Sequence, residues 1–232
     1  ARAASWRTPL LRTQPFTVGP MRLTKFGHAC VRVEHEGTTV VIDPGAFTAP
    51  EAVDGADLVL VTHVHADHWT PEQLRRADAP VRTIGEVADG IAAQAPDLGE
   101  RVERVRPGDT FAAGGIEVEV VNEHHAVIHP DYDRVHNSGY LLDVGGTTLF
   151  HPGDALDGPG RPVDLLLAPV SAPWLKISEA IDFALAVGAP RTLAIHDKVY
   201  SELALGMADG HLRTFLEPRG QEYLRLPDGA DL

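Results

Sequence analysis

The sequence has a single cysteine, Cys30, in 232 residues. No disulfide can form within the chain, which favours a reducing compartment, and we predict a cytoplasmic location. Cys30 lies in an apolar stretch and is predicted to be a small buried residue rather than a nucleophile. No apolar run of about 18 residues is present, so the sequence predicts no membrane-spanning helix.

Basic residues are also few, since 20 lysines and arginines stand against 33 acidic residues, for a formal net charge of −13. Nucleic-acid-binding proteins normally present a basic patch, and an acidic surface repels phosphate backbones. The densest basic segment, residues 101–106, also contains Glu103, and we interpret it as a solvated charged edge. A nucleic-acid partner is therefore disfavoured, and a small-molecule substrate is expected. The oligomeric state stays open.

The first 20 residues lack the apolar core of a signal peptide, whereas a strand pattern begins at Met21. We interpret residues 1–20 as a leader or an added segment and Met21 as the natural start. Apolar residues make up 44% of the chain, enough for a sizeable core. Because no composition break or repeat follows Met21, residues 21–232 are predicted to form one mixed α/β domain.

Short apolar runs separated by turn residues predict many strands with helices between them. Thr70, Pro71 and Gln73 are typical of a helix start, with Thr70 as N-cap and Gln73 completing a capping box. Gly188 and Pro190 are expected to end a later helix. Strands are predicted at 30–35, 38–42, 57–62, 81–84, 116–121, 140–144, 147–150, 163–168, 192–195 and 223–226, and helices at 71–77, 86–94, 178–187 and 212–216.

Three histidines and an aspartate, His63, His65, Asp67 and His68, lie within six residues between a predicted buried strand and the capped helix. Side chains two positions apart in an extended segment point the same way, so His63 and His65 can hold one metal ion together. The turn into the helix can redirect Asp67 and His68 to a second ion. Imidazole and carboxylate suit zinc, and also iron or manganese. The sequence therefore predicts two divalent metal ions, with zinc as first choice.

Four ligands cannot complete two metal sites, and further candidates also follow predicted strands. Strand ends on a rigid scaffold commonly present functional side chains. The repetition of this placement strengthens the metal interpretation. The candidates are Glu123, His124 and His125 after the strand at 116–121, His151 and Asp154 after 147–150, and His196 and Asp197 after 192–195.

This arrangement resembles the metallo-β-lactamase superfamily. The resemblance is carried by the H-x-H-x-D-H motif of residues 63–68, a histidine after a later strand, the Gly153-Asp154 pair and the late His196. Within the superfamily, the segments FGHA at 26–29, IDP at 42–44 and NSGY at 137–140 resemble the L-ascorbate-6-phosphate-lactonase-like hydrolases. The resemblance covers residues 21–232.

The resemblance implies an α/β fold, a four-layer αββα sandwich with the metal ions at one edge. It implies that Asp154 bridges the two ions. His125 matches the family pattern better than His124, and His129 is a third candidate, as a substrate contact. The implied ligands are His63, His65 and His125 for the first ion and Asp67, His68 and His196 for the second.

Two cations a few ångströms apart lower the pKa of a bridging water from about 15.7 toward 7, so that a metal-bound hydroxide can attack a carbonyl or phosphoryl centre. Asp67 is the predicted catalytic residue that orients this water or takes its proton. Metal-bound histidines need acceptors for their other ring nitrogen. Asp43 and Asp197 are candidates for this role, or are turn residues.

Four other side chains have open roles. His28 is either a residue near the metals or a structural one, and Lys176 either binds an anionic group or is a solvated lysine. Trp69 and Trp174 are predicted to pack in the core.

The predicted function is hydrolysis of a small ester, lactone or phosphoester. A true β-lactamase role is disfavoured for two reasons. Those enzymes are exported, whereas this sequence shows no signal peptide, and some of them use a cysteine ligand, whereas this sequence has no cysteine after Cys30. The alternatives are a di-iron redox or metal-sensing protein on the same fold, and a metal-dependent phosphodiesterase or nuclease. Redox relatives typically carry glutamate where His65 stands here and depend on a flavin domain.

Overall fold

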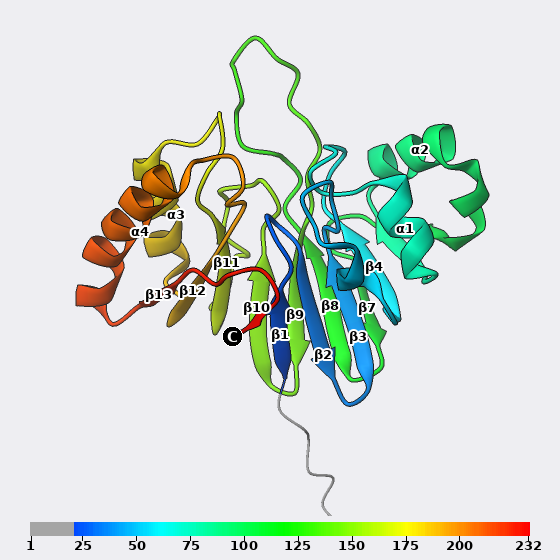
Figure 1. Cartoon of the computed structure of the whole chain (residues 1–232), viewed down its shortest axis with the longest axis horizontal. Coiled ribbons are helices and arrows are strands. Elements are labelled where there is room, and N and C mark those ends of the chain that lie inside the picture. The colour runs from blue at the N-terminus through cyan, green and yellow to red at the C-terminus, as the bar shows by residue number, and fades with distance from the viewer. Residues whose placement is uncertain (1–20) are drawn as a thin grey trace, which may run out of the picture.

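The computed structural model describes residues 21–232, so the interpretation of residues 1–20 lies outside the described residues. Two seven-stranded sheets face each other at the centre, with helices on the outer side of each (Figure 1). This is the predicted αββα sandwich. The first sheet runs in the order β14 (Ala230–Asp231), β1 (Arg22–Lys25), β2 (Val31–His35), β3 (Thr38–Ile42), β4 (Leu58–Val61), β5 (Val81–Thr83) and β6 (Val102–Arg104).

The second sheet lies opposite and is also mixed, with β10, β11, β12 and β13 parallel and the rest antiparallel. Its order is β13 (Glu222–Leu224), β12 (Arg191–Ile195), β11 (Leu165–Pro169), β10 (Thr147–His151), β9 (Gly139–Val144), β8 (Ile116–Val121) and β7 (Thr110–Ala113). The outer layers are α1 (Pro71–Ala77) and α2 (Gly85–Gln94) on the first sheet, and α3 (Ile177–Val187) and α4 (Glu202–Leu216) on the second. Three short 3-10 helices are η1 (Pro50–Val53), η2 (Pro96–Arg101) and η3 (Glu217–Arg219).

Apolar side chains form three layers, one between the sheets and one under each helical pair. Strand β4 contributes to two of them, because Leu58 and Leu60 point between the sheets while Val59 and Val61 pack with the residues of α1 and α2. Each such fully buried side chain stabilises the fold by about 1.5–3 kcal/mol. The prediction that this strand is buried on both faces is confirmed.

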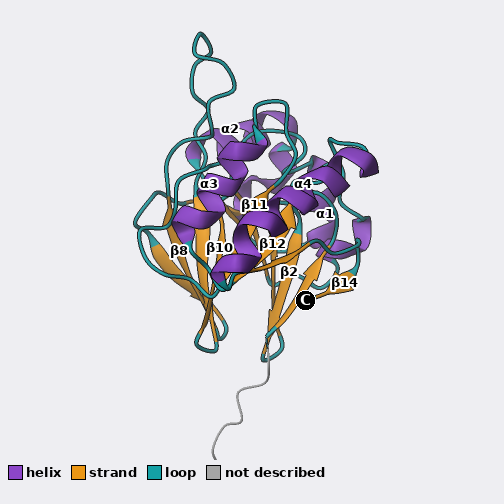
Figure 2. Cartoon of the chain, turned by 90° about the vertical axis from the view of Figure 1, so that its left-hand side faces the viewer, coloured by secondary structure: helices purple, strands orange, loops and turns teal. Residues whose placement is uncertain are grey.

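Turn chemistry places the hairpins as predicted. Glu36 and Gly37 join β2 to β3, and Gly145 and Gly146 join β9 to β10, all four with positive φ. Two consecutive positive φ angles match the right-handed twist of the flanking strands. Both hairpins turn at the end of the sandwich opposite the long loop of residues 122–138 (Figure 2).

Several elements differ from the predictions. Helix α4 begins at Glu202 rather than at residue 212, capped by Ser201 Oγ, which accepts from Ala204 N. Its exposed Leu203, Met207 and Phe215 blur the amphipathic pattern. The prediction missed the short strands β6, β7 and β14, and the last predicted strand, 223–226, lies at 222–224. These edge strands have only two to four residues, which is too short for an alternating apolar pattern to stand out.

The prediction for the start of helix α1 is half right. Thr70 Oγ1 accepts from Gln73 N as predicted, but the Gln73 side chain donates to the Thr48 carbonyl at 2.9 Å and does not reach back to Thr70. The predicted capping box is therefore incomplete, because a buried loop carbonyl competes for the amide.

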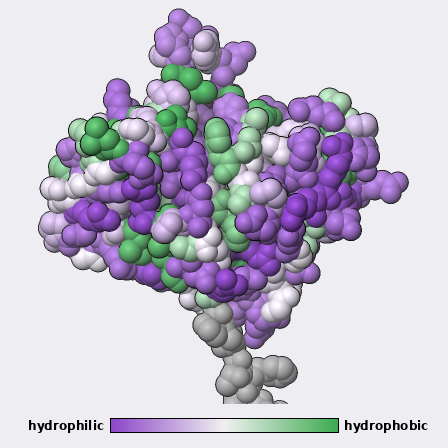
Figure 3. Space-filling model, in the orientation of Figure 1, coloured by the Kyte–Doolittle hydropathy of each residue, from purple (hydrophilic) through white to green (hydrophobic). Residues whose placement is uncertain are grey.

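The surface matches the composition. The face shown in Figure 3 is mostly hydrophilic. The basic segment 101–106 runs from the end of η2 through edge strand β6, and in it Arg101 pairs with Asp78 and Arg104 with Asp89. Within residues 21–232, no helix is both long and apolar enough to cross a membrane.

Candidate metal centre

Eight side chains with metal-binding chemistry gather at one end of the sandwich, and they form two groups. In each group, one potential ligand atom per residue lies within 4.8 Å of those of the others. Seven of the eight are the residues predicted from sequence, and the eighth is His28. The groups are His63, His65, His125 and Asp154, and His28, Asp67, His68 and His196.

Asp154 lies between the two groups. Its Oδ1 is 3.2 Å from His68 Nε2, and its Oδ2 is 3.2 Å from both His125 Nε2 and His196 Nε2. His63 Nε2 lies 3.8 Å from the same Oδ2. One buried carboxylate therefore faces imidazoles of both groups, which is the position that the resemblance implied for a bridging residue.

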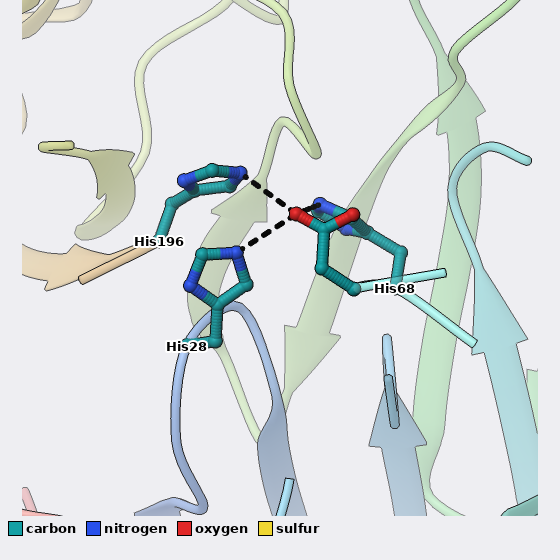
Figure 4. Close-up of side chains that lie close together, drawn as sticks. His28, His68 and His196 are labelled. Atoms are coloured by element: carbon teal, nitrogen blue, oxygen red, sulfur yellow. Dashed lines mark hydrogen bonds and ion pairs between the residues drawn. The ribbon is translucent and has the colours of Figure 1, made fainter. Parts of the chain in front are cut away.

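Asp67 is the centre of the second group. Figure 4 shows the imidazoles of His28, His68 and His196 pointing toward one carboxylate. This is Asp67, whose Oδ2 lies 3.0 Å from His28 Nε2, 3.4 Å from His196 Nε2 and 3.8 Å from His68 Nε2.

A close backbone approach shapes the 63–68 loop. A Cβ at Gly45 would lie 1.8 Å from the Asp67 carbonyl oxygen, so only glycine fits there. Ala46 N donates to the Ala66 carbonyl at 2.9 Å and ties the two loops together. The Asp43-Pro44-Gly45 turn, far from the motif in sequence, thus sets the path of the loop.

Asp43 holds the motif from behind. It is fully buried and accepts hydrogen bonds from His68 Nδ1 at 2.7 Å and from the backbone and hydroxyl of Thr62, both at 2.8 Å. This confirms Asp43 as an acceptor for a site histidine. Asp197 contacts none of the described imidazoles by a hydrogen bond and instead forms a buried ion pair with Lys25 at 2.7 Å, so that candidate role was wrong.

Two more imidazoles use Nδ1 in the same way. His125 Nδ1 lies 2.6 Å from the Ala126 carbonyl, and His196 Nδ1 lies 2.5 Å from the Ser171 carbonyl. A carbonyl can only accept, so each Nδ1 donates and, in a neutral ring, leaves the Nε2 lone pair free. These lone pairs point into the cluster.

The site fits a cation. Among the described residues, His68 Nε2, His125 Nε2, His196 Nε2 and Asp154 Oδ1 are buried polar atoms without a hydrogen bond of good geometry. Buried polar atoms are normally paired, and an unpaired one needs an explanation such as a bound ion. Nitrogen and carboxylate donors of this kind are those that divalent transition metals take.

Electrostatics differ between the two groups. Burial lowers the pKa of His63 and of His65, so these imidazoles are neutral at pH 7. Burial opposes protonation of His68 and His196 as well, but the Asp154 carboxylate outweighs it and raises the pKa of His196 to about 9 and that of His68 well above its ordinary value. Without metal, the second group therefore holds protons that a cation would displace.

Burial alone would raise the pKa of both site carboxyls. For Asp67, the neighbouring imidazoles of His196 and His28 outweigh it, and for Asp154 the charges of His196 and His68 do so. Both pKa values are held below their ordinary range, so both groups are ionised at neutral pH.

We expect metal affinity to rise with pH in the range from about 6.5 to 9, by up to about tenfold per pH unit for each displaced proton. The raised pKa of His196 in the folded state stabilises the metal-free protein. This stabilisation is complete below about pH 6.5 and is lost as the pH rises through about 9. Competition with a chelator at several pH values measures the affinity, and urea unfolding of metal-free protein measures the stability. Affinity that stays flat over this range would contradict the assignment.

The remaining predicted residues are placed as follows. His124 is exposed and pairs through its backbone with His136, and His129 is exposed, so His125 is the histidine brought into the cluster. Lys176 is 80% exposed and lies 3.7 Å from Glu179, which matches a solvated lysine.

The two tryptophans differ. Trp69 is buried and donates to the Val64 carbonyl, as predicted for the core. Trp174 is only partly buried, and its ring lies 5.2 Å from that of His125 and 5.9 Å from that of His196. The core prediction for Trp174 is confirmed in part, because its side chain packs against the small apolar cluster of Ala172, Leu175 and Ala180 while its ring also lies beside the two histidines.

The chain matches a family model described as a β-lactamase superfamily domain over residues 22–196. It belongs to the metallo-β-lactamase superfamily. It is 39% identical over 197 residues to Protein Rv0786c of Mycobacterium tuberculosis, covering 83% of this chain and 91% of that protein. It is 30% identical to UPF0173 protein PF0020 of Pyrococcus furiosus, covering 78% and 86%. A UPF0173 metal-dependent hydrolase of Methanosphaerula palustris is 27% identical, covering 91% and 99%.

Two solved structures share the fold of this chain. Igni18, a metallo hydrolase from Ignicoccus hospitalis, superposes with a TM-score of 0.70 at 18% identity, covering 91% of this chain and 97% of that one. CmlA, a diiron β-hydroxylase from Streptomyces venezuelae, superposes with a TM-score of 0.74 at 18% identity, covering 92% of this chain and 54% of that one. Its identity to the UPF0173 proteins makes the chain a member of the UPF0173 family of metal-dependent hydrolases, and its narrower resemblance to the ascorbate-6-phosphate lactonases stays a prediction.

Proposed function

We propose that this UPF0173 member is a dinuclear metal hydrolase that cleaves a small ester or lactone. The observation that carries the proposal is the Asp154 carboxylate, which lies within 3.2 Å of imidazoles from both ligand groups. His63, His65 and His125 would hold one ion, and Asp67, His68 and His196 the other, with Asp154 shared. Zinc is the metal we expect, because the donors are imidazole nitrogens and carboxylate oxygens.

Two bound cations would supply Lewis acidity and lower the pKa of a coordinated water. The chain's own residues do the rest. Asp67 is ionised and its side chain is 25% exposed, more than any other carboxylate of the cluster, so it can accept a hydrogen bond from a solvent-borne nucleophile and orient it. Asp43, Ser171 and Ala126 hold the rings of His68, His196 and His125 by their Nδ1 atoms, so the ligand geometry is set before substrate binds.

The surroundings favour a small, mostly uncharged substrate. A cavity of about 380 Å³ adjoins His125 and is bordered by Ile128 and Tyr132 of the 122–138 loop. Trp174 adds an aromatic surface beside His125 and His196. Lys25 and Lys198 are paired with Asp197 and Asp228, so neither lysine stands free for a phosphate group. Arg134, which also lines the cavity, donates from its Nε to the His125 carbonyl.

Metal analysis of protein purified without added metal tests this proposal. We expect about two equivalents of zinc per chain, together with hydrolysis of a panel of carboxylic esters and lactones that a chelator abolishes and zinc restores. A chain that carries no metal and has no affinity for it would overturn the proposal. Phosphodiester substrates in the same panel test the phosphodiesterase alternative.

A second candidate function is oxidative. The fold of CmlA, a diiron β-hydroxylase, superposes on this chain over 92% of its length. Two equivalents of iron with oxygen consumption, and no hydrolysis of any ester or lactone, would favour this second candidate.

A further inference from the structure

His28 is the member of the cluster whose role the predicted ligand set leaves open. It lies in the turn between β1 and β2, is fully buried and has a φ of +51°, in the left-handed region that a non-glycine residue adopts at a cost of about 1 kcal/mol. The turn is closed by a bond from Cys30 N to the Gly27 carbonyl, and the His28 carbonyl accepts from His196 N at 2.8 Å. The structure thus holds this strained residue firmly in place.

The hydrogen bonds of His28 determine where its proton is. Its Nδ1 lies 3.2 Å from the backbone nitrogen of Lys198. A backbone N–H can only donate, so Nδ1 accepts and carries a lone pair. A neutral imidazole has one ring proton, which must then be on Nε2. Nε2 lies 3.0 Å from Asp67 Oδ2, so His28 donates this proton to the carboxylate.

This tautomer is the opposite of that of its neighbours. His68, His125 and His196 donate from Nδ1 to Asp43, Ala126 and Ser171, which leaves their Nε2 atoms free for a cation. In His28 the Nε2 atom that faces the cluster carries the proton and offers no lone pair. Lying close to ligand-type atoms therefore does not make His28 a ligand.

We propose that His28 is a positioning residue that orients Asp67 for the second metal ion and does not bind metal itself. This inference rests on the proposed function. Asp67 stands on a loop and its side chain is 25% exposed, so without a donor behind it the carboxylate is free to turn toward solvent. The bond from His28 holds Oδ2, the oxygen that also lies 3.4 Å from His196 Nε2 and 3.8 Å from His68 Nε2, and this oxygen keeps a further lone pair for the metal ion.

Two substitutions at this position separate positioning from ligation. His28→Gln can keep a donor amide near the position of Nε2 but offers a poor metal ligand, whereas His28→Leu removes the donor. His35→Leu is the matched control, because His35 is also a buried histidine, on β2 at the end away from the cluster. Zinc titrations against a chelator give the affinity for each equivalent, and thermal unfolding of the metal-free variants reports folding.

We expect His28→Leu to weaken binding of the second equivalent by about 10- to 100-fold, with the first equivalent changed by no more than about threefold. His28→Gln should restore most of the lost affinity, and His35→Leu should bind both equivalents as the wild type does. Equal losses in the Leu and Gln variants, or no loss in either, would overturn the inference. Wild-type protein that binds no metal would overturn the proposed function, and this inference with it.

A measurement on the unmodified protein covers the case in which the variants fail to fold. Nitrogen-15 imidazole spectra of wild-type protein, with and without zinc, report which ring nitrogen carries the proton. The Nε2–H tautomer of His28 is expected in both states. A deprotonated Nε2 in the zinc-loaded protein would show that His28 ligates the metal and is not a positioning residue.

Discussion

Replacing Asp154 by alanine is expected to remove tight metal binding at both positions and to lower kcat/KM by about 1,000-fold or more. The carboxylate is buried and lies within 3.2 Å of His68, His125 and His196, so its loss would take one ligand from each ion of the proposed pair. A metal ion stabilises transition-state charge by several kcal/mol, and about 4 kcal/mol corresponds to roughly a thousandfold in rate. Metal content by mass spectrometry and ester or lactone hydrolysis are the measurements.

The neighbouring Asp157 provides the control. It is exposed, and its backbone carbonyl accepts a hydrogen bond from Asn122 Nδ2, so Asp157→Ala should retain both metals and full turnover. His65→Ala should lose the ion of the first group while the second group keeps its own ligands. An Asp154→Ala protein that still binds two equivalents tightly would refute a bridging role, and circular dichroism of each variant checks that the fold is retained.

Replacing Lys25 by methionine is expected to destabilise the protein by about 3–5 kcal/mol, because it leaves a buried charge without its partner. Lys25 is 0% exposed and Asp197 5%, and their charged atoms lie 2.7 Å apart. Folded proteins of this size are stable by only about 5–15 kcal/mol, so the loss is a large share of the total. Asp197 follows His196 directly, so we also expect weaker binding of the second metal ion. Urea unfolding and zinc titration measure the two effects.

Two further variants test whether the unpaired buried charge causes the loss of stability. The double variant Lys25→Met with Asp197→Asn removes both charges and should recover much of the lost stability, because no uncompensated charge remains. Lys198→Met breaks a partly exposed pair with Asp228, about 38% exposed on each side, and should cost about 1 kcal/mol or less. A Lys25→Met protein as stable as the Lys198→Met protein would show that the buried pair stabilises the fold no more than the partly exposed pair does.

The local features of the fold were predictable because they depend on neighbours in sequence. Thr70 caps α1 by accepting from Gln73 N, and Gly37 and Gly146 take the positive φ angles of tight hairpins. The alternation in residues 116–121 and the apolar run in β4 placed two central strands. Edge strands and the first ten residues of α4 escaped prediction because their burial depends on partners that are distant in sequence.

The candidate site also has features that were predictable from sequence and features that depend on the fold. The residue types and spacing of the 63–68 motif were enough to predict a metal site, since His63, His65, Asp67 and His68 lie within six residues and their chemistry is local. Tertiary structure decided that His125 and not His124 enters the cluster, because only one of two adjacent side chains can point inward from the loop after β8. It also paired Asp197 with Lys25, a residue 172 positions away.

By itself, the sequence determined the chemistry of this protein: which ligand types are present, and that most of them follow strands. Only the tertiary structure decided how each one is used. His28 and His196 illustrate the reason, since both are buried histidines with positive φ in one cluster. One has a backbone N–H beside its Nδ1 and the other a backbone carbonyl, and that contact, made by residues brought close only by folding, determines which nitrogen is left to bind a metal.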